Sequence, residues 1–313
     1  MEQTLTTVDD VGSYIEAVEK IGRQLDESLL PMRMYFRGQA STDYELLPSL
    51  ARQIHESRNL EFGFERRIVE YVEEAFPKAF RDIRTPIDRL AFLQHHGAPT
   101  RLLDITSSSL VALFFAVASS SEDNGEVIVF GPVDRESERY PMDMAIADSY
   151  RMIRGSIDPL AHFFEQVRVQ EYFQEQRNLV DNCIDTMKGG ARWVYDCCKS
   201  PIFVHSYHHS VRQRIQQSSF ILFPNDINNN NPENPYFLEK ISPLSKEHEV
   251  VIARLLIPSS SKKHVLNQLQ LMGINKAALF ADSINVICEE AGKFALSHVF
   301  SRSSSQISGQ AYS

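Results

Sequence analysis

The stretch Gln94-His-His-Gly-Ala-Pro-Thr-Arg-Leu-Leu-Asp-Ile-Thr-Ser-Ser-Ser-Leu-Val-Ala-Leu-Phe-Phe-Ala-Val-Ala118 decides how the rest of the sequence is interpreted. It joins a histidine pair, a Gly/Pro turn, an Arg-x-x-Asp pair and a run of hydroxyls to an apolar segment at 110–118 with helical character. Polar side chains held on a loop by a buried element are the usual layout of a binding or catalytic site. The sequence therefore predicts a functional site on a loop before a buried helix.

The composition is typical of a soluble globular protein. Of the 313 residues, 43% are hydrophobic and 23% are charged, and the length allows one large domain or two intimate ones. The net charge of −9 and the pI near 5.6 argue against non-specific binding to nucleic acid, which needs a basic face. A local basic pocket remains compatible with this charge.

The chain has no features of a membrane or secreted protein. No stretch approaches eighteen consecutive apolar residues, and the first ten residues are polar and acidic, unlike a signal peptide. Four cysteines in a chain of this length do not form a disulfide framework. We therefore expect a cytoplasmic protein that does not bind membranes.

Hydrophobic periodicity predicts a mixture of helices and strands. Apolar residues recur at helical spacing in the segments 8–29, 60–80, 87–94, 110–118 and 259–272. Short apolar runs bounded by turn residues predict strands at 34–39, 126–130, 220–223 and 250–257. The more polar middle, from about 135 to 212, is predicted to be a helical insertion. The fold class expected is α+β, with a small mixed or antiparallel sheet flanked by helices.

Two clusters of polar side chains are predicted to have structural roles and no part in catalysis or metal binding. The glutamates of segment 60–80, Glu65 among them, are predicted to face solvent, while Tyr71 and Phe76 join its apolar stripe. A second cluster, which lacks the Cys-x-x-Cys spacing of a zinc site, consists of Cys197, Cys198, His205, His208 and His209. Buried cysteines and surface histidines are expected there, and no metal is predicted.

Four blocks of the sequence resemble the FRG domain, a family named for a Phe-Arg-Gly triplet. They are Tyr35-Phe36-Arg37-Gly38-Gln39, His96-Gly97-Ala98-Pro99-Thr100-Arg101-Leu102-Leu103-Asp104, Ala112-Leu113-Phe114-Phe115-Ala116 and Arg214-Ile215-Gln216-Gln217-Ser218-Ser219-Phe220. The chain departs from the family where Ile105 replaces a usual Trp and where a serine replaces the Gly before the final Phe. The resemblance implies an FRG-like domain at 33–285, with the helical insertion at about 135–212. The helix expected at 8–29 then gives an N-terminal helical segment at 1–32, and residues 286–313 form a C-terminal tail.

The same residues are similar to elements of the arginine-specific ADP-ribosyltransferases. Arg37-Gly38 resembles the Arg-Gly that ends the first strand of that superfamily, and Thr106-Ser107-Ser108 resembles its Ser-Thr-Ser strand. This resemblance implies NAD as a substrate, because a guanidinium can fork onto a pyrophosphate and hydroxyls can hold the nicotinamide ribose. Glu247 and Glu249 look like the Glu-x-Glu element that supplies the catalytic carboxylate. A solvated strand end is the other interpretation of this common pattern.

Two other classes of function stay open. A non-catalytic module would bind a nucleotide, a nucleic-acid end or a protein target through an anion pocket of Arg37, His96, Arg101 and Arg214. A hydrolase would use His95 or His96 as base and a nucleophile from 107–109, although no Gly-x-Ser-x-Gly elbow supports it. By resemblance alone, such domains belong to bacterial or phage stress and defence systems, where a toxin role is expected.

The predicted site assigns a role to each group of residues. Arg37, with Gly38 and Gln39, binds phosphate or pyrophosphate. Arg101 and Asp104 pair and fix the loop, and Asp104 is an alternative catalytic carboxylate. His96 donates a hydrogen bond or a proton. The other ligand contacts come from Thr100, Thr106, Ser107, Arg214 and Gln217, of which Gln217 orients the ligand.

Overall fold

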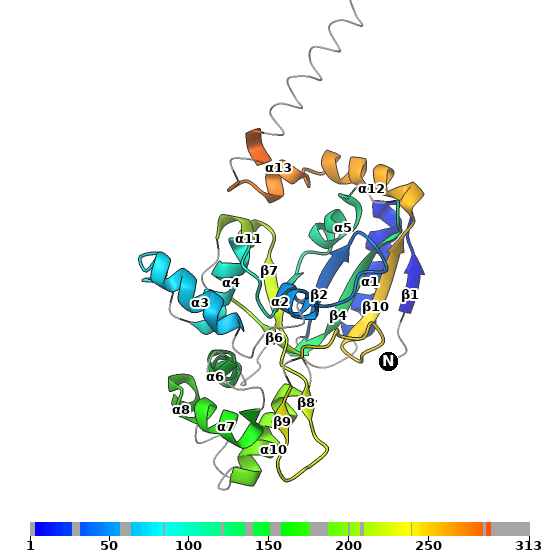
Figure 1. Ribbon diagram of the computed structural model, residues 1–313. Coiled ribbons are helices and arrows are strands. Elements are labelled where there is room, and N and C mark those ends of the chain that lie inside the picture. The colour runs from blue at the N-terminus through cyan, green and yellow to red at the C-terminus, as the bar shows by residue number, and fades with distance from the viewer. Residues whose placement is uncertain are drawn as a thin grey trace, which may run out of the picture.

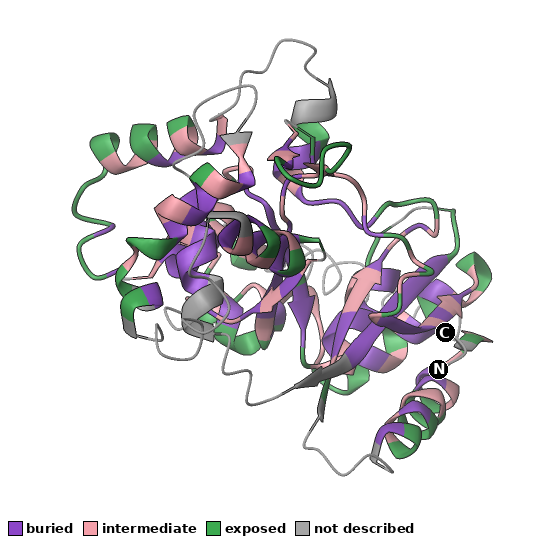
Figure 2. Cartoon of the chain, turned by 90° about the horizontal axis from the view of Figure 1, so that it is seen from below, coloured by how far each residue is buried: buried purple, intermediate pink, exposed green. Residues whose placement is uncertain are grey.

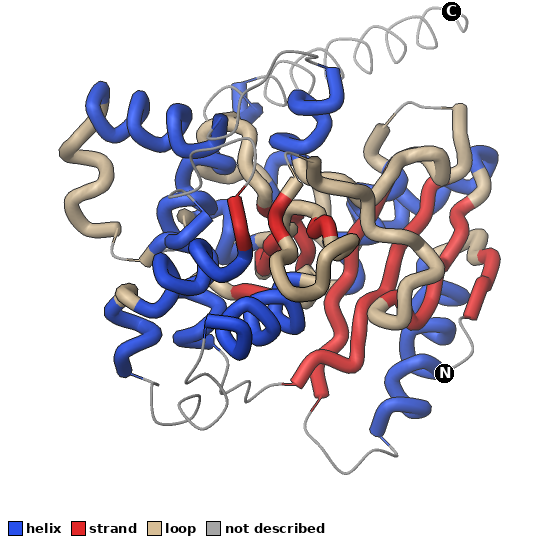
Figure 3. The backbone as a smooth tube through the Cα atoms, turned by 60° about the horizontal axis from the view of Figure 1, so that its bottom comes forward, coloured by secondary structure: helices blue, strands red, loops and turns tan. Residues whose placement is uncertain are grey.

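A seven-stranded mixed sheet forms the centre of the protein, and helices pack around it (Figure 1). The computed structural model describes residues 4–26, 32–56, 64–83, 85–119, 122–134, 140–150, 158–175, 187–199, 201–206, 210–238, 240–283 and 286–288. Figure 3 shows the strands running through the middle of the molecule, with helices on either side of them. The α+β class expected from the sequence is confirmed.

The strand order of the sheet is β1-β10-β4-β2-β3-β7-β6. Neighbouring strands are antiparallel except β1, which is parallel to β10. The strands are β1 (Thr4–Thr7), β2 (Met32–Gln39), β3 (Leu102–Thr106), β4 (Gly125–Asp134), β6 (Ile202–Val204), β7 (Ser218–Leu222) and β10 (Val251–Ile257). A separate three-stranded sheet contains β5 (Asp158–Pro159), β8 (Ile227–Asn228) and β9 (Tyr236–Phe237). The main sheet is larger than predicted because β1, β3 and β6 were not foreseen.

Two groups of helices cover different parts of the sheet. Three of them share a hydrophobic core with β2, β4 and β10, namely α1 (Val11–Asp26), α5 (Ser109–Val117) and α12 (Ser259–Leu271). Four others share a core with β3 and β7, namely α4 (Pro86–His95), α6 (Tyr140–Tyr150), α7 (Leu160–Arg168) and α10 (Met187–Cys198). The remaining helices are α2 (Ser49–Glu56), α3 (Phe64–Ala75), α8 (Glu171–Glu175), α11 (Val211–Ile215) and α13 (Lys276–Leu279).

Strand alternation separates the two faces of the sheet. Phe36 of β2 points into the core under α1 and α5, whereas its neighbour Tyr35 belongs to a third core on the opposite face. That third core also holds Ile105 and Ile128 of the sheet and Leu50 of α2. We call this side the α2 face. Figure 2 shows buried strands enclosed by helices whose outer sides are exposed.

The middle of the chain is helical, as predicted, in the part that the structure describes. α6, α7, α8 and α10 lie together below the main sheet in Figure 1. Aromatic rings join them: Phe163 packs against Tyr150 and Phe237 with ring centroids 5.1 and 4.9 Å apart, and Trp193 packs against Phe173 at 5.8 Å. These contacts stabilise the lobe by burial of large rings.

Three local predictions are wrong. Residues 102–106 form a strand rather than a loop, because Leu103 and Ile105 fill the α2-face core while Leu102 fills the core on the other side. The N-terminal segment is not only helical, since β1 precedes α1 and joins the sheet. Tyr71 of α3 and Phe76 just after it are 76% and 67% exposed and Glu65 is buried, against the prediction, whereas Phe64, Ile68 and Val72 of the predicted stripe pack against the cores.

One residue pair joins the two halves of the main sheet. β2 and β3 are in register only at Phe36 and Thr106, whereas β2 and β4 pair along most of their length. Immediately after this pair, Gly38 meets α5 so closely that a Cβ atom there would lie 1.8 Å from the carbonyl oxygen of Ala112. Within the Phe-Arg-Gly triplet, Phe36 therefore packs in the core, and Gly38 lets the backbone of α5 lie directly against β2.

We expect Gly38→Ala to destabilise the fold by about 2–4 kcal/mol, because the added methyl group meets fixed backbone rather than a movable side chain. Gly12→Ala is the matched control. The nearest atom to a Cβ at Gly12 is 3.4 Å away, so this variant should be neutral or up to about 1 kcal/mol more stable. Urea unfolding measures both, and equal stabilities of the two variants would contradict the close approach.

Candidate functional site

Arg37 lies where β2 and β3 separate. Its side chain is half-buried, and Nη1 donates to the carbonyl oxygen of Asp104 at 2.5 Å. This bond crosses the opening beyond the Phe36–Thr106 pair. The Nε atom is buried and has no hydrogen-bond partner among the described residues. A buried guanidinium donor without a partner is costly, which makes it a candidate for ligand binding.

A second guanidinium lies near Arg37 and was missed by sequence reasoning. Arg52 of α2 donates to the carbonyl oxygen of Leu47 at 2.6 Å. Burial lowers the pKa of Arg37, the charge of Asp104 opposes this shift, and the charge of Arg52 lowers the pKa further. In the described residues neither arginine has a carboxylate within ion-pair distance. Arg52 is exposed, and the Asp104 carboxylate acts on Arg37 without forming an ion pair with it, so both guanidiniums retain donors suited to an anion.

Gln39 adds an acceptor beside these donors. It is two residues from Arg37 on the same face of β2 and is 4% exposed. Its Nε2 donates to the carbonyl oxygen of Glu45 at 3.3 Å, while its Oε1 has no partner among the described residues. One strand therefore carries an unsatisfied donor and an unsatisfied acceptor at positions i and i+2.

The rest of the α2 face is also cationic. Glu126, which is fully buried opposite Gln39, accepts from Arg254 at 2.9 and 3.0 Å and from Lys246. Lys246 also donates to the carbonyl oxygen of Thr42 at 2.7 Å. One buried carboxylate therefore pairs with two cations, and Arg37 and Arg52 add two guanidiniums that have no ion pair in the part of the chain that the structure describes. This region is locally basic in a chain whose net charge is −9.

The predicted carboxylates lie at the edge of this region. Glu247 is 73% exposed, accepts from the Ser245 hydroxyl at 2.9 Å and lies 3.9 Å from Nη1 of Arg254. Arg37, Ile128 and Arg254 are aligned across three strands, so the Cα atoms of the two arginines are about 10 Å apart. Glu249 is exposed. Glu247 and Arg37 are thus brought to the same side of the sheet.

Arg101 is part of the core rather than of an open site. The predicted pair with Asp104 is not formed, and Asp104 is exposed. Instead the Arg101 guanidinium pairs with Glu65 at 2.5 Å, donates to the carbonyl oxygen of Phe223 at 3.1 Å and lies 3.9 Å from the ring centroid of Tyr150. This buried pair explains why Glu65 faces inward, against the prediction of a solvated face.

The hydroxyl run is divided between structure and site. Ser108 caps α5 by accepting from the Val111 amide, and Thr106 donates to the carbonyl oxygen of Gln216. Ser107 is exposed and donates to Oε1 of Gln217 at 3.1 Å. Gln217 has a φ of +47°, the one positive φ at a non-glycine residue in the described ranges. The predicted Ser107–Gln217 proximity is therefore present.

The other predicted residues do not surround Arg37. Thr100 is buried, bonded to Gln94 and to Ser49. Arg214 is exposed on α11. His96 is the exposed C-cap of α4, with its ring 4.6 Å from that of Phe92.

The hydrolase arrangement is not formed. His95 lies 3.4 Å from the Ser210 hydroxyl and 3.6 Å from Asp282, whereas Ser107 and Ser108 have the partners given above. Ser210 itself caps α11 through the Gln213 amide. His95 therefore joins α4 to α11 and to the segment after α13.

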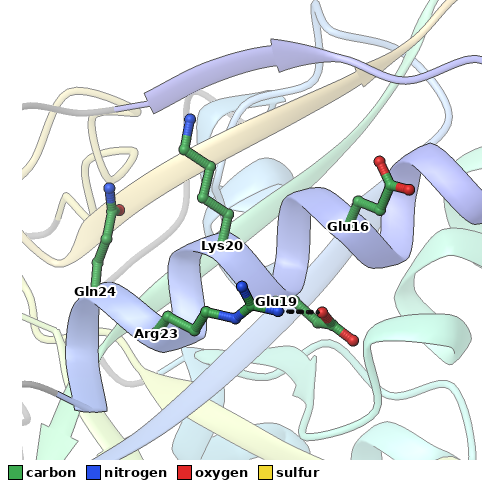
Figure 4. A pocket seen from close by; sticks show the side chains of 5 residues that line it. All are labelled: Glu16, Glu19, Lys20, Arg23 and Gln24. Carbon is green, nitrogen blue, oxygen red and sulfur yellow. Dashed lines mark hydrogen bonds and ion pairs between the residues drawn. The ribbon is translucent and has the colours of Figure 1, made fainter.

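Several other features carry no chemistry in the described part of the chain. A depression of about 330 Å³ is lined by side chains that all belong to α1, and Figure 4 shows Arg23 of this group paired with Glu19. Among the described residues no group of three His, Cys, Asp or Glu side chains is placed to hold a metal, and no helix is long and apolar enough to cross a membrane. His208 and His209 lie outside the described residues.

The comparison with known families supports the resemblance found in the sequence. Residues 32–125 match the FRG domain family, so this part of the chain is an FRG domain. It includes β2, α2, β3 and α5, and therefore Arg37, Arg52 and Gln39. No curated protein and no solved structure matches the chain. The extension of the resemblance to 285, and with it the roles of Gln217 and Glu247, stays a prediction.

We expect Glu65→Gln to lower the free energy of unfolding by about 3–5 kcal/mol, because it leaves the Arg101 charge buried without a partner. Glu70→Gln on the same helix removes an exposed pair with Arg66 and should cost less than about 1 kcal/mol. Chemical denaturation compares the two. Similar losses for both would show that Arg101 does not depend on Glu65.

We also expect His95 to make the protein less stable in mild acid. Burial lowers its pKa below the ordinary value of 6.5, although the charge of Asp282 opposes this. The unfolded chain then binds more protons than the folded chain as the pH falls through about 6.5, so stability falls with it. His95→Gln should reduce the loss of stability between about pH 7.5 and pH 5.5. An unchanged pH profile in denaturant titrations would exclude this role.

Proposed function

We propose that the FRG domain binds a nucleotide diphosphate such as NAD at Arg37 and Arg52, and that the chain cleaves or transfers its ADP-ribose group. One observation carries the proposal: two guanidiniums whose charges interact have backbone carbonyls as their hydrogen-bond partners, and no carboxylate of the described residues lies within ion-pair distance of them, although Asp104 is near enough to act on Arg37. A pyrophosphate supplies both the negative charge and the paired oxygens that such groups bind best.

The neighbouring groups support a ligand with more than a phosphate. The free Nε–H of Arg37 and the free Oε1 of Gln39 suit a donor–acceptor edge, such as a carboxamide or a base. The exposed Ser107 hydroxyl and the Gln217 amide are suited to ribose hydroxyls. A nucleotide contains all of these groups, whereas inorganic phosphate contains one.

The chemistry of this proposal needs a carboxylate. Cleavage breaks the bond between the ribose anomeric carbon and the nicotinamide nitrogen, and the electron pair leaves with nicotinamide. Water or an acceptor side chain then bonds to the anomeric carbon and gives up a proton. Glu247, close to Arg254 on the same face, is the candidate for stabilising the oxocarbenium-like transition state, with Glu249 as the second candidate. A defence or toxin role rests on resemblance alone.

A non-catalytic nucleotide-binding module is the second candidate function. Its supporting observation is that Glu247 is 73% exposed and is tied to Ser245, so its carboxylate is not held against the arginine pair. A catalytic carboxylate is normally held in place by its surroundings. Binding without cleavage would then be the whole activity of the site.

The test measures ADP-ribose binding by calorimetry and nicotinamide release from NAD. We expect ADP-ribose to bind, and Arg37→Lys or Arg52→Ala to weaken it about 10–100-fold, because a charged hydrogen bond is worth about 1.5–3 kcal/mol. Arg23→Ala on α1 removes an exposed arginine and should leave the affinity unchanged. Thermal melting of each variant establishes that it is folded.

The two readouts separate the two functions. Nicotinamide release that is lost in Glu247→Gln supports the enzyme, and binding without release supports the module. If ADP-ribose and NAD neither bind nor shift the melting temperature at about 1 mM, the nucleotide site is overturned.

A further inference from the structure

A second pocket lies on the other side of the segment that carries Glu247. It has a volume of about 540 Å³ and lies between the end of α10, the segment after β7 and the residues that precede β10. Its lining residues include Cys198, Lys199, Phe223, Leu244, Ser245 and His248. The volume is in the range of small-molecule sites.

The inner wall of the pocket is built from groups that are already satisfied. Nη1 of Arg101 donates to the Phe223 carbonyl and to Oδ1 of Asn225, both at 3.1 Å, and Nδ2 of Asn225 donates to the Leu238 carbonyl at 2.9 Å. Asp226 accepts from the amide and the hydroxyl of Ser242 at 3.0 and 2.6 Å. These bonds fix the wall, so the pocket is formed before any ligand arrives.

Two side chains at the pocket, His248 and Lys199, have N–H donors available to a ligand. Nδ1 of His248 accepts from the Val250 amide at 3.3 Å, which leaves the proton of the neutral ring on Nε2 as a donor. Lys199 is 55% exposed, and among the described residues its ammonium contacts Asp196, at 3.4 Å. Phe223 and Leu244 are buried in the wall, and the half-buried Pro224 and Ile227 supply apolar surface. The one carboxylate in the lining, Asp226, is occupied by Ser242 and lies 4.0 Å from Lys240.

We propose that this pocket binds a small organic anion, with its apolar body against Pro224 and Ile227 and its anionic group at Lys199 and His248. The ligand class follows from the charge and the lining, since both free donors favour an anion and the remaining surface is apolar. The site is separate from Arg37 and does not depend on the function proposed for it.

The pocket shares a segment with the arginine site. The amide of Leu244 donates to the carbonyl oxygen of Leu46 at 3.0 Å, two residues before Lys246 pairs with Glu126. A ligand that contacts His248 therefore lies against the same segment that carries Lys246 and Glu247.

The test titrates the full chain with phenyl phosphate and with benzoate, using ligand-observed NMR and calorimetry. We expect a dissociation constant of about 1 mM for at least one of them, which is ordinary for a ligand of this size. Benzyl alcohol and inorganic phosphate each lack one half of the ligand and should bind at least about fivefold more weakly. The better of the two anions identifies a phosphate or a carboxylate ligand.

Variants place the ligand in this pocket. Lys199→Glu should weaken binding about fivefold or more, and Ser245→Trp, at an exposed lining position, should block it. Lys263→Glu makes the same change of charge at an exposed position on α12 and should have no effect. Arg37→Ala should leave binding unchanged, which keeps this result independent of the nucleotide site. The proposal is overturned if neither anion binds, if benzyl alcohol binds as well, or if Lys199→Glu and Ser245→Trp bind normally.

Discussion

The contact on which the rest of this structure depends is the crossing of β2, β3 and α5 around the Phe-Arg-Gly triplet. The Phe36–Thr106 pair is where β2 and β3 are in register, and it continues through Val129 and Ala253 to Thr4 and, on the other side, to Ser218. One residue later the Arg37 side chain spans the opening, and one residue after that Gly38 admits the backbone of α5. Phe36, Arg37 and Gly38 thus lie at the β2–β3 register, at the opening between these strands and at the close approach of β2 to α5, in that order.

The opening between the strands is a consequence of this geometry and has an electrostatic cost. In a continuous pair of strands, the backbone groups of β2 and β3 would hydrogen-bond to each other. Beyond Phe36 they do not, and the Arg37 guanidinium donates to the Asp104 carbonyl oxygen instead. Burial disfavours the charged form of Arg37, the Asp104 carboxylate offsets this in part, and the charge of Arg52 adds to the cost. The other cations of the α2 face, Lys246 and Arg254, add little to this cost because the fully buried Glu126 carboxylate neutralises part of their charge. An anionic ligand would remove the residual cost.

Sequence reasoning identified the right region but not the partner of each residue. Apolar patterning located α4, α5 and β10 to within one or two residues, because each is a run of mostly buried apolar residues. It missed β1, which is four residues long and mostly threonine, and β3, whose polar Asp104 interrupts the apolar pattern. The Arg101–Asp104 pair was expected from local spacing, whereas the true partner, Glu65, is 36 residues away. Arg52 could not be found from the sequence, since its proximity to Arg37 exists only after α2 packs on the sheet.

The two motif arginines show how charge separates structure from function. Arg101 has a carboxylate, two oxygen acceptors and an aromatic face, and therefore has nothing left to offer a ligand. Arg37 has one carbonyl, an unused Nε–H and a like charge nearby, although it is also substantially buried. Folding alone would favour the first arrangement and disfavour the second, because an unpaired buried donor lowers stability. A motif residue kept in the disfavoured state is more readily explained by a ligand than by packing, and this reasoning makes Arg37, rather than the more elaborate motif around Arg101, the centre of the site.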